Sequence, residues 1–188
     1  MASSVVGLRR FLGALALLLL AHQATRRRAL RVHRRSGSKL VTLSDAAAAG
    51  FTVCRTWAFN DGGNSPLQSS PGVYNKNVFQ GLDFVISEAK NHGIHLILCL
   101  INNFKDFGGR PQYVQWARNA SESIQTDDDF YTNSKVKQYY KNHVQEVLTR
   151  VNTITKIAYK DDPTIMSWEL MNEPRYEVDH SGQTVTQA

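Results

Sequence analysis

A carboxamide and a carboxylate stand next to each other near the C-terminal end of the chain, at Asn172 and Glu173. An apolar run that begins at Ile165 leads into them and Pro174 follows, so the pair is predicted to lie where a buried strand gives way to a loop. In α/β enzymes the chemistry takes place at this end of parallel strands, and a carboxyl group there suits general acid catalysis on a polar substrate. The alternative is an ordinary solvated strand end.

Arg55 and Trp57 end another predicted strand, and in a parallel barrel they would reach the same rim as Glu173. An arginine near catalytic carboxylates keeps one of them ionised, and a tryptophan offers a flat apolar surface to a sugar ring. A structural ion pair for Arg55 and core packing for Trp57 are the alternatives. Asn102 and Asn103 end the strand between these two and could hydrogen-bond substrate hydroxyls, although asparagine is also an ordinary turn residue.

The elements that must position these residues alternate between strands and helices. Short apolar runs at 51–57, 94–101 and 164–170 predict three strands. Apolar residues at helical spacing predict one helix over 78–89 and a longer one over 136–158. This repeated order of strand, loop and helix predicts an α/β fold with parallel pairing and right-handed crossovers.

The net charge of +6 is concentrated in the first 50 residues. Nine Lys and Arg stand there against one acid, whereas residues 51–188 carry a net charge of −2. A folded part without a cluster of basic side chains has no surface that would bind a phosphate backbone, so we expect no nucleic-acid partner.

The beginning of the chain has the composition of a targeting region. Arg9 and Arg10 precede an apolar run at 11–21, which is too short to span a bilayer and is typical of a secretory signal. Arg-rich, acid-poor heads also occur in organelle transit peptides, which is the alternative. A glycosylation motif at Asn119-Ala120-Ser121 agrees with secretion.

These features divide the chain into three parts. We expect residues 1–24 to be a signal-like segment, 25–42 a basic linker and 43–188 the folded part. The expected location is extracellular, in the secreted space or the cell wall, with no membrane contact after the signal is removed. The oligomeric state is left open.

The cysteines, histidines and clustered acids indicate neither a disulfide framework nor a cofactor. Cys54 and Cys99 lie within apolar runs and are predicted to be buried free thiols. His92 and His95 flank a turn and are expected to point apart, and Asp127–Asp129 lacks the spacing of a calcium loop. The acidic triplet is interpreted as a solvated cap before a helix, and no metal or organic cofactor is expected.

Seven motifs together resemble the plant endo-β-1,4-mannanases of glycoside hydrolase family 5, over about residues 43–182. The resemblance implies a (β/α)8 barrel and retaining hydrolysis of β-1,4-mannosidic linkages in mannans, galactomannans and glucomannans. It assigns the proton donor to Glu173, a substrate-binding amide to Asn172, a substrate-contacting aromatic ring to Trp57 and a place near the nucleophile to Arg55. The motifs are Cys54–Phe59, Asp61–Gly63, Leu67–Tyr74, Phe79–Asp83, Gly93–Ile97, Thr149–Thr153 and Trp168–Arg175.

Compared with that family, residues 43–188 are expected to form a partial (β/α)8 TIM barrel, about the second to fourth βα region, lacking the first strand and the C-terminal half. A typical barrel needs about 250 residues. Three strands without their neighbours would leave exposed sheet edges.

The catalytic pair is also expected to be incomplete. Retaining glycosidases need two carboxyl groups about 5–5.5 Å apart, and the family takes its nucleophile from a glutamate on the seventh strand. Glu169 is about 13 Å from Glu173 if a strand rises roughly 3.3 Å per residue, and Glu177 lies in an unconstrained loop. We therefore expect a mannan-type polysaccharide as partner but no hydrolysis by this chain alone. A non-catalytic mannan-binding remnant and an unstable product of a truncated gene are the alternatives.

Overall fold

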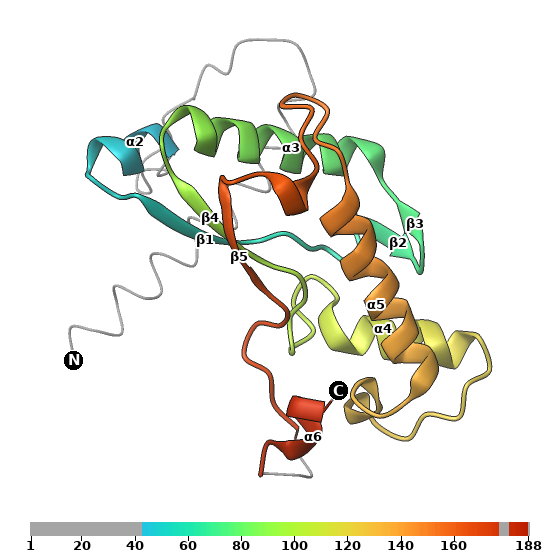
Figure 1. The fold of residues 1–188 in the computed structure, drawn as a ribbon. Helices are drawn as coiled ribbons and strands as arrows, with labels where there is room; N and C mark the ends of the chain where they lie inside the picture. Colours follow the sequence, from blue (N-terminus) through green and yellow to red (C-terminus); the bar gives the residue numbers. More distant parts are fainter. Residues whose placement is uncertain (1–42, 177–180, 188) are drawn as a thin grey trace, which may run out of the picture.

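A computed structural model of the chain describes residues 43–176 and 181–187. The signal-like segment and the basic linker predicted from the sequence, together with Glu177, lie outside the described residues. Three strands, β1 (Val53–Trp57), β4 (His95–Cys99) and β5 (Ile165–Glu169), form a parallel sheet in the order β1-β4-β5 (Figure 1). The three predicted strands and their parallel pairing are thus confirmed.

The register of the sheet brings the C-terminal ends of the strands to one edge. Trp57 pairs with Cys99, and Cys99 pairs with Glu169 on the other side of β4. Beyond the strands, Asn102 and Asn172 form one further parallel bridge. Polar residues that are distant in sequence therefore meet at this edge.

Two long helices make the crossovers between the strands. Helix α3 (Lys76–Asn91) connects β1 to β4, and α5 (Ser134–Thr149) precedes β5. The Asn75 and Asn133 side chains each accept two backbone N–H groups of the first helical turn, which fixes where each helix begins.

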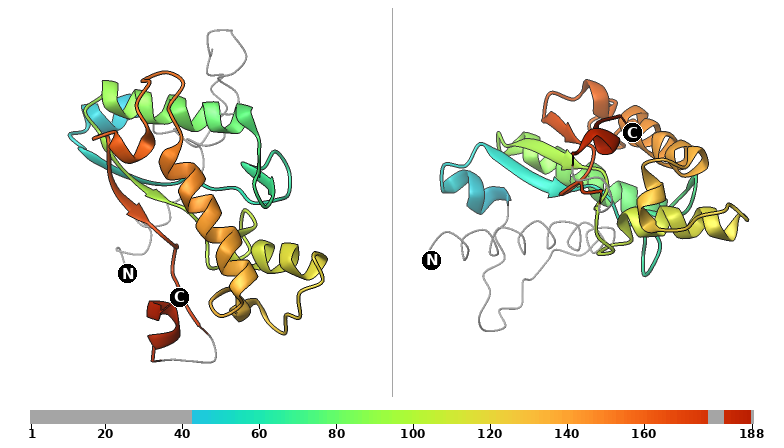
Figure 2. Two further views of the ribbon diagram at one scale, coloured as in Figure 1. Left: turned by 45° about the vertical axis from the view of Figure 1, so that its right-hand side comes forward. Right: turned by 90° about the horizontal axis from the view of Figure 1, so that it is seen from below.

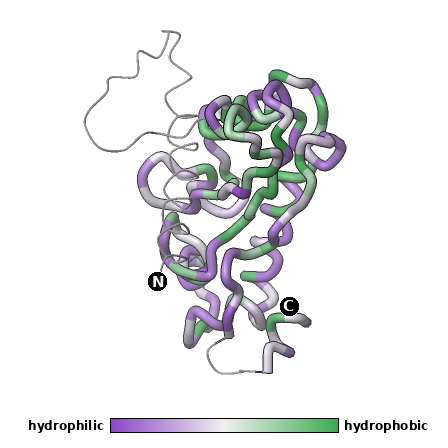
Figure 3. Tube along the Cα trace, turned by 90° about the vertical axis from the view of Figure 1, so that its left-hand side faces the viewer, coloured by the Kyte–Doolittle hydropathy of each residue, from purple (hydrophilic) through white to green (hydrophobic). Residues whose placement is uncertain are grey.

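The main core lies between the helices and one face of the sheet. Side chains alternate along a strand, so Leu96 and Leu98 of β4 are fully buried in this core while His95 is exposed. Hydrophobic segments accordingly run through the middle of the molecule in Figure 3. The core includes Phe79, Leu82, Ile86, Ala89, Ile94, Leu96, Leu98, Val147, Tyr159 and Ile165.

The opposite face of the sheet is open among the described residues. Val53 on β1 is 43% exposed and Met166 on β5 is 55% exposed. The sequence predicted β4 to be covered on both faces. On this second face Ile97 is half-buried and Cys99 is buried, so the described residues cover β4 there only toward its C-terminal end.

A second, smaller cluster lies beyond the C-terminal edge of the sheet (Figure 2). It is built from α4 (Gly109–Asn119), the 3₁₀-helix η1 (Asp127–Phe130) and the start of α5, with Tyr113, Trp116 and Phe130 among its buried rings. The short elements that complete the fold are α2 (Leu43–Ala48), the antiparallel hairpin β2 (Gln68–Ser70) and β3 (Val73–Tyr74), η2 (Tyr159–Asp161) and α6 (Gln183–Gln187).

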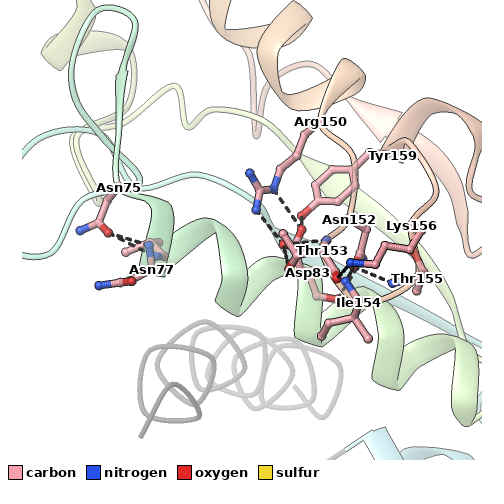
Figure 4. Close-up of polar contacts among 11 residues, drawn as sticks. Asn75, Asn77, Asp83, Arg150, Asn152, Thr153, Ile154, Thr155, Lys156 and Tyr159 are labelled. Carbon is pink, nitrogen blue, oxygen red and sulfur yellow. Dashed lines mark hydrogen bonds and ion pairs between the residues drawn. The ribbon is translucent and has the colours of Figure 1, made fainter.

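Helix α5 is shorter than its apolar stripe predicts. It ends at Thr149 because the next residues turn toward Asp83, a fully buried carboxylate on α3 (Figure 4). Asp83 accepts hydrogen bonds from the Arg150 guanidinium at 2.7 Å, the Thr153 hydroxyl at 2.7 Å and the Tyr159 hydroxyl at 2.6 Å. Burial alone would raise the pKa of Asp83, but these hydrogen bonds outweigh it and lower that pKa.

The acidic triplet differs from its interpretation as a solvated cap. Asp128 is buried and forms an ion pair with Arg110, whereas Asp129 accepts backbone N–H groups of the turn that enters η1. The cap of α5 is Asn133. The prediction of a cap holds for Asp129, which forms a capping box with Thr126 at the start of η1. It is wrong for Asp128, because the arginine that neutralises Asp128 is 18 residues away.

Within 43–176 and 181–187, no helix is long and apolar enough to cross a membrane, and no three His, Cys, Asp or Glu side chains gather as metal ligands. Cys54 and Cys99 are free thiols as predicted, but only Cys99 is buried, because Cys54 lies on the edge strand β1 and is half-exposed. Burial raises the pKa of both thiols, that of Cys99 to about 12, so neither is a ready nucleophile.

Candidate active site

Asn172 is held firmly at the end of β4 although it lies three residues beyond β5. Its backbone N–H donates to the Ile101 carbonyl at 2.8 Å, and its carbonyl accepts from the Asn103 N–H at 3.1 Å. The residue is buried. The carboxamide that the sequence singled out therefore sits on a fixed backbone at the C-terminal edge of the sheet.

Glu173 follows directly and turns the chain out of the sheet. Its φ of 49° is left-handed, a region that costs a residue with a Cβ about 1–2 kcal/mol. The residue is exposed, and its carboxylate has no hydrogen-bond partner among the residues that the structure describes. The bridge at Asn172 fixes the backbone just before this turn, and the exposed Glu173 lies at the rim.

Arg55 connects the two outer strands. Its Nε donates to Glu169 Oε2 at 2.7 Å and its Nη2 to Glu169 Oε1 at 2.8 Å, across the central strand. The same Nη2 donates to Asn172 Oδ1 at 2.7 Å. The hydrogen bond to Glu169 is the main reason that the pKa of Arg55 is raised, so the guanidinium stays charged. Arg55 therefore forms the structural ion pair that was the alternative to a catalytic role. It also contacts Asn172 in the candidate site.

The hydrogen-bond network continues from Asn172 to β4. Asn172 Nδ2 donates to Asn102 Oδ1 at 2.9 Å. Glu169, Arg55, Asn172 and Asn102 are therefore linked in series along the C-terminal edge, and three of the four were candidate residues in the sequence.

Trp57 belongs to an aromatic group at the same edge. Its ring is stacked on Phe59, with centroids 5.0 Å apart and planes 28° apart. Phe107, from the loop after β4, meets it edge-on at 5.7 Å and is itself 38% exposed. Trp57 is only half-buried, so packing against neighbouring rings accounts for one part of its surface and leaves another part accessible.

A supporting layer lies beside Asn103. Its Oδ1 accepts from the Tyr131 hydroxyl at 2.9 Å, and its backbone carbonyl accepts from Arg110 Nε at 3.3 Å. Arg110 is in turn fixed by its buried pair with Asp128. Asn103 therefore has a structural role here, and Tyr131 and Arg110 were not recognised in the sequence.

Glu169 was considered in the sequence only as a substitute nucleophile, and its role as the partner of Arg55 was missed. The available signal was the opposite charge of Arg55 and Glu169 near the ends of two predicted parallel strands. That signal identifies a pair only once the strand order and register are known.

The parallel βα units, with a polar rim at the carboxyl ends of their strands, form a part of an α/β fold. Residues 42–187 match the family described as GH family 5 beta-mannosidase-like, and the chain belongs to this family.

Named relatives agree with this assignment. The chain is 66% identical over 143 residues to mannan endo-1,4-beta-mannosidase 5 of Solanum lycopersicum, a match that covers 76% of this chain and 34% of the relative. It is 60% identical over 151 residues to mannan endo-1,4-beta-mannosidase 3 of Oryza sativa subsp. japonica, covering 80% of this chain and 32% of the relative. The chain thus spans about a third of the length of these curated relatives.

The fold is similar to that of a solved enzyme. The hyperthermostable endo-1,4-beta-D-mannanase from Thermotoga petrophila superimposes with a TM-score of 0.72 at 39% sequence identity, over 77% of this chain and 43% of that chain. This similarity confirms the predicted fold class, a partial α/β barrel.

Proposed function

We propose that this chain contributes to the active site of an endo-β-1,4-mannanase that cleaves mannans, galactomannans and glucomannans. The observation that carries the proposal is the Asn172–Glu173 pair at the carboxyl edge of the sheet, bridged to Asn102 and lying on the rim that also bears Arg55 and Trp57. Membership of the family and the mannanase relatives support it.

In the proposed reaction, Glu173 donates a proton to the glycosidic oxygen as the leaving sugar departs. A carboxylate attacks the anomeric carbon from the opposite face, and a covalent glycosyl-enzyme forms. Water then hydrolyses this intermediate while Glu173, now ionised, accepts the proton of the water. Asn172 hydrogen-bonds a sugar hydroxyl and Trp57 packs against a sugar face. No metal or organic cofactor takes part in this scheme.

The attacking carboxylate is not Glu169 in this proposal. Both oxygens of Glu169 accept hydrogen bonds from Arg55, which neutralises the carboxylate and turns it toward β1. The nucleophile is therefore assigned to residues outside those that the structure describes. On their own, the described residues favour a second function, mannan binding without hydrolysis.

The proposed location is outside the cell, in the secreted space or the cell wall, where mannan polysaccharides occur as substrates. The signal-like composition of residues 1–24 supports this proposal. So does the exposure of Asn119 at the end of α4, where a glycan could be attached.

Electrophoresis in native gels that contain galactomannan tests the proposed substrate. The wild-type chain is expected to migrate more slowly than in gels without polysaccharide. Trp57→Ala is expected to lose this retardation, whereas Glu173→Gln, which removes only the acid, is expected to keep it. Equal migration of the wild-type chain in both gels would contradict mannan recognition. Reducing-sugar release from mannan by the wild-type chain alone would contradict the second function.

A further inference from the structure

We infer that Glu169 is a positioning residue, which acts through Arg55 to set the orientation of the Asn172 carboxamide. The inference rests on the proposed function in one respect, that Asn172 binds sugar. The geometry of the three side chains carries the rest.

The first step is the rigidity of Arg55. Two donors of one planar guanidinium meet the two oxygens of Glu169 at 2.7 and 2.8 Å, an arrangement that fixes both the position and the plane of the guanidinium. A single acceptor, or a neutral one, would leave the guanidinium free to rotate. The pair joins β1 to β5, so it also fixes Arg55 relative to the strand that carries Asn172.

The second step is the direction of the carboxamide. Arginine has only donors, so the Asn172 atom that meets Nη2 at 2.7 Å must be the oxygen. The Asn172 nitrogen then faces Asn102, whose oxygen accepts from it at 2.9 Å. In turn, Asn102 directs its own Nδ2 toward the Asp106 carbonyl at 3.5 Å. The charge of Arg55 thereby selects one of two carboxamide orientations that are almost identical in shape.

The third step is what this orientation leaves for a ligand. Asn172 Nδ2 carries two hydrogens, and only the one directed at Asn102 has a partner among the described residues. We assign the second hydrogen to a hydroxyl of the bound sugar, which follows from the proposed role of Asn172. If the carboxamide were reversed, the Asn172 oxygen would occupy this position in place of the nitrogen. A bound sugar hydroxyl would then have to donate a hydrogen bond instead of accepting one.

Glu169 also limits what Arg55 does elsewhere. Glu173 is another acid whose charge acts on Arg55. Glu169 holds the Nε hydrogen and one Nη2 hydrogen, and Asn172 holds the other Nη2 hydrogen, so together they leave Arg55 no second donor for a two-bond pair with the proposed proton donor.

NMR of the isotopically labelled full chain, combined with calorimetric titration of β-1,4-mannohexaose, tests the inference. Glu169→Gln removes the charge and keeps the shape, and Glu169→Asp restores the charge on a shorter stem. Asp127→Asn is the matched control because it removes the carboxylate of a separate, partly exposed arginine pair, Arg118–Asp127.

In Glu169→Gln we expect the Arg55 Nε hydrogen to exchange with solvent roughly tenfold faster and the two Asn172 side-chain amide signals to move together. We expect mannohexaose affinity to fall roughly tenfold, the loss of about one charged hydrogen bond. Glu169→Asp should recover part of each effect, and Asp127→Asn should resemble the wild type. If Glu169→Gln does not fold, Glu169→Asp supplies the same comparison with a smaller effect.

Unchanged Arg55 and Asn172 signals in Glu169→Gln would overturn the positioning role. Changed signals with unchanged mannohexaose affinity would overturn its link to sugar binding. A folded wild-type chain that binds no mannohexaose would instead contradict the proposed function, and the NMR comparison would still decide whether Glu169 orients Asn172.

Discussion

Arg55 and Glu169 form a two-bond ion pair across the central strand although they are 114 positions apart in the chain. The pair connects the outer strands of the described sheet at the edge where the polar candidate residues gather. The pair therefore stabilises the sheet and also lies in the candidate site.

Replacing Arg55 by lysine should weaken this connection without removing the charge. A lysine ammonium is a point charge and cannot make two parallel bonds to a carboxylate. Because the pair is about one third exposed, we expect the free energy of unfolding to fall by only about 1 kcal/mol. Urea denaturation measures the change, with Arg118→Lys as the control. An unchanged free energy of unfolding would show that the pair contributes no stability.

Asp83→Asn should be much more damaging. The variant loses the charge that compensates Arg150 and weakens the bonds from Thr153 and Tyr159, which all meet at the fully buried Asp83 carboxylate. Breaking such a pair is expected to lower the free energy of unfolding by about 3 kcal/mol. Asp161→Asn is the control, since its pair with Lys160 is exposed and should contribute less than about 1 kcal/mol. Equal effects in thermal or urea unfolding would contradict the stabilising role of the Asp83 cluster.

The stability of the chain should fall in mild acid through His143. This imidazole is fully buried among the rings of Tyr74, Tyr113 and Tyr140, and burial lowers its pKa to about 4. An unfolded histidine titrates at about 6.5. Below that pH the unfolded state therefore binds a proton that the folded state does not, and stability is lost as the pH falls from about 6.5 to about 4.

The expected loss from His143 is up to about 3 kcal/mol over this range. His143→Gln keeps a hydrogen-bonding side chain beside the Tyr74 hydroxyl but does not titrate, so its free energy of unfolding should depend less on pH. His92→Asn removes a histidine from the surface and should keep the wild-type pH dependence. The same slope in all three proteins would show that folding does not lower the pKa of His143.

Gly108→Ala tests how the aromatic group at the rim is positioned. A Cβ at Gly108, where φ is +89°, would overlap the main-chain carbonyl of Asp61. Gly50 has a similar φ of +81° but no atom within 4 Å, so Gly50→Ala measures backbone strain alone, about 1–2 kcal/mol.

We expect Gly108→Ala to lower the free energy of unfolding by roughly 2 kcal/mol more than Gly50→Ala, because a rigid backbone must move. It should also weaken mannan retention, since Phe107 precedes Gly108 and contacts Trp57. Both effects are read from urea denaturation and galactomannan gels. Equal free energies of unfolding of the two variants would mean that the Asp61 backbone can move away from the new Cβ with little loss of stability.

The strands and their polar ends could be predicted from the sequence because the evidence for them is local. An apolar run that closes on Asn172 and Glu173 predicts both a strand and its end, and the parallel order places Arg55 and Trp57 on the same rim. In the structure Arg55 lies at this rim, where it donates a hydrogen bond to Asn172. The roles of Glu173, Asn172, Trp57 and Arg55 toward a substrate remain predictions.

What the sequence did not reveal depends on partners distant along the chain. Helix α5 ends before its apolar stripe does because Arg150 and Thr153 bond to Asp83, which is 67 and 70 residues away. Asp128 is buried instead of solvated because of Arg110. Local patterns predict elements, whereas the ends of elements and the pairing of charges follow from how the elements meet.

The left-handed backbone conformation of Glu173 lowers the stability of the folded chain, whereas its carboxylate is needed for the proposed chemistry. Glycine would adopt a φ of 49° without strain, and asparagine more easily than glutamate, so either replacement would make the folded chain more stable while removing the carboxylate. A chain shaped only for stability would carry one of those residues at this position. The proposed acid role requires a carboxylate at this solvent-facing turn, and the proposal therefore predicts a cost in stability at Glu173 in return for activity.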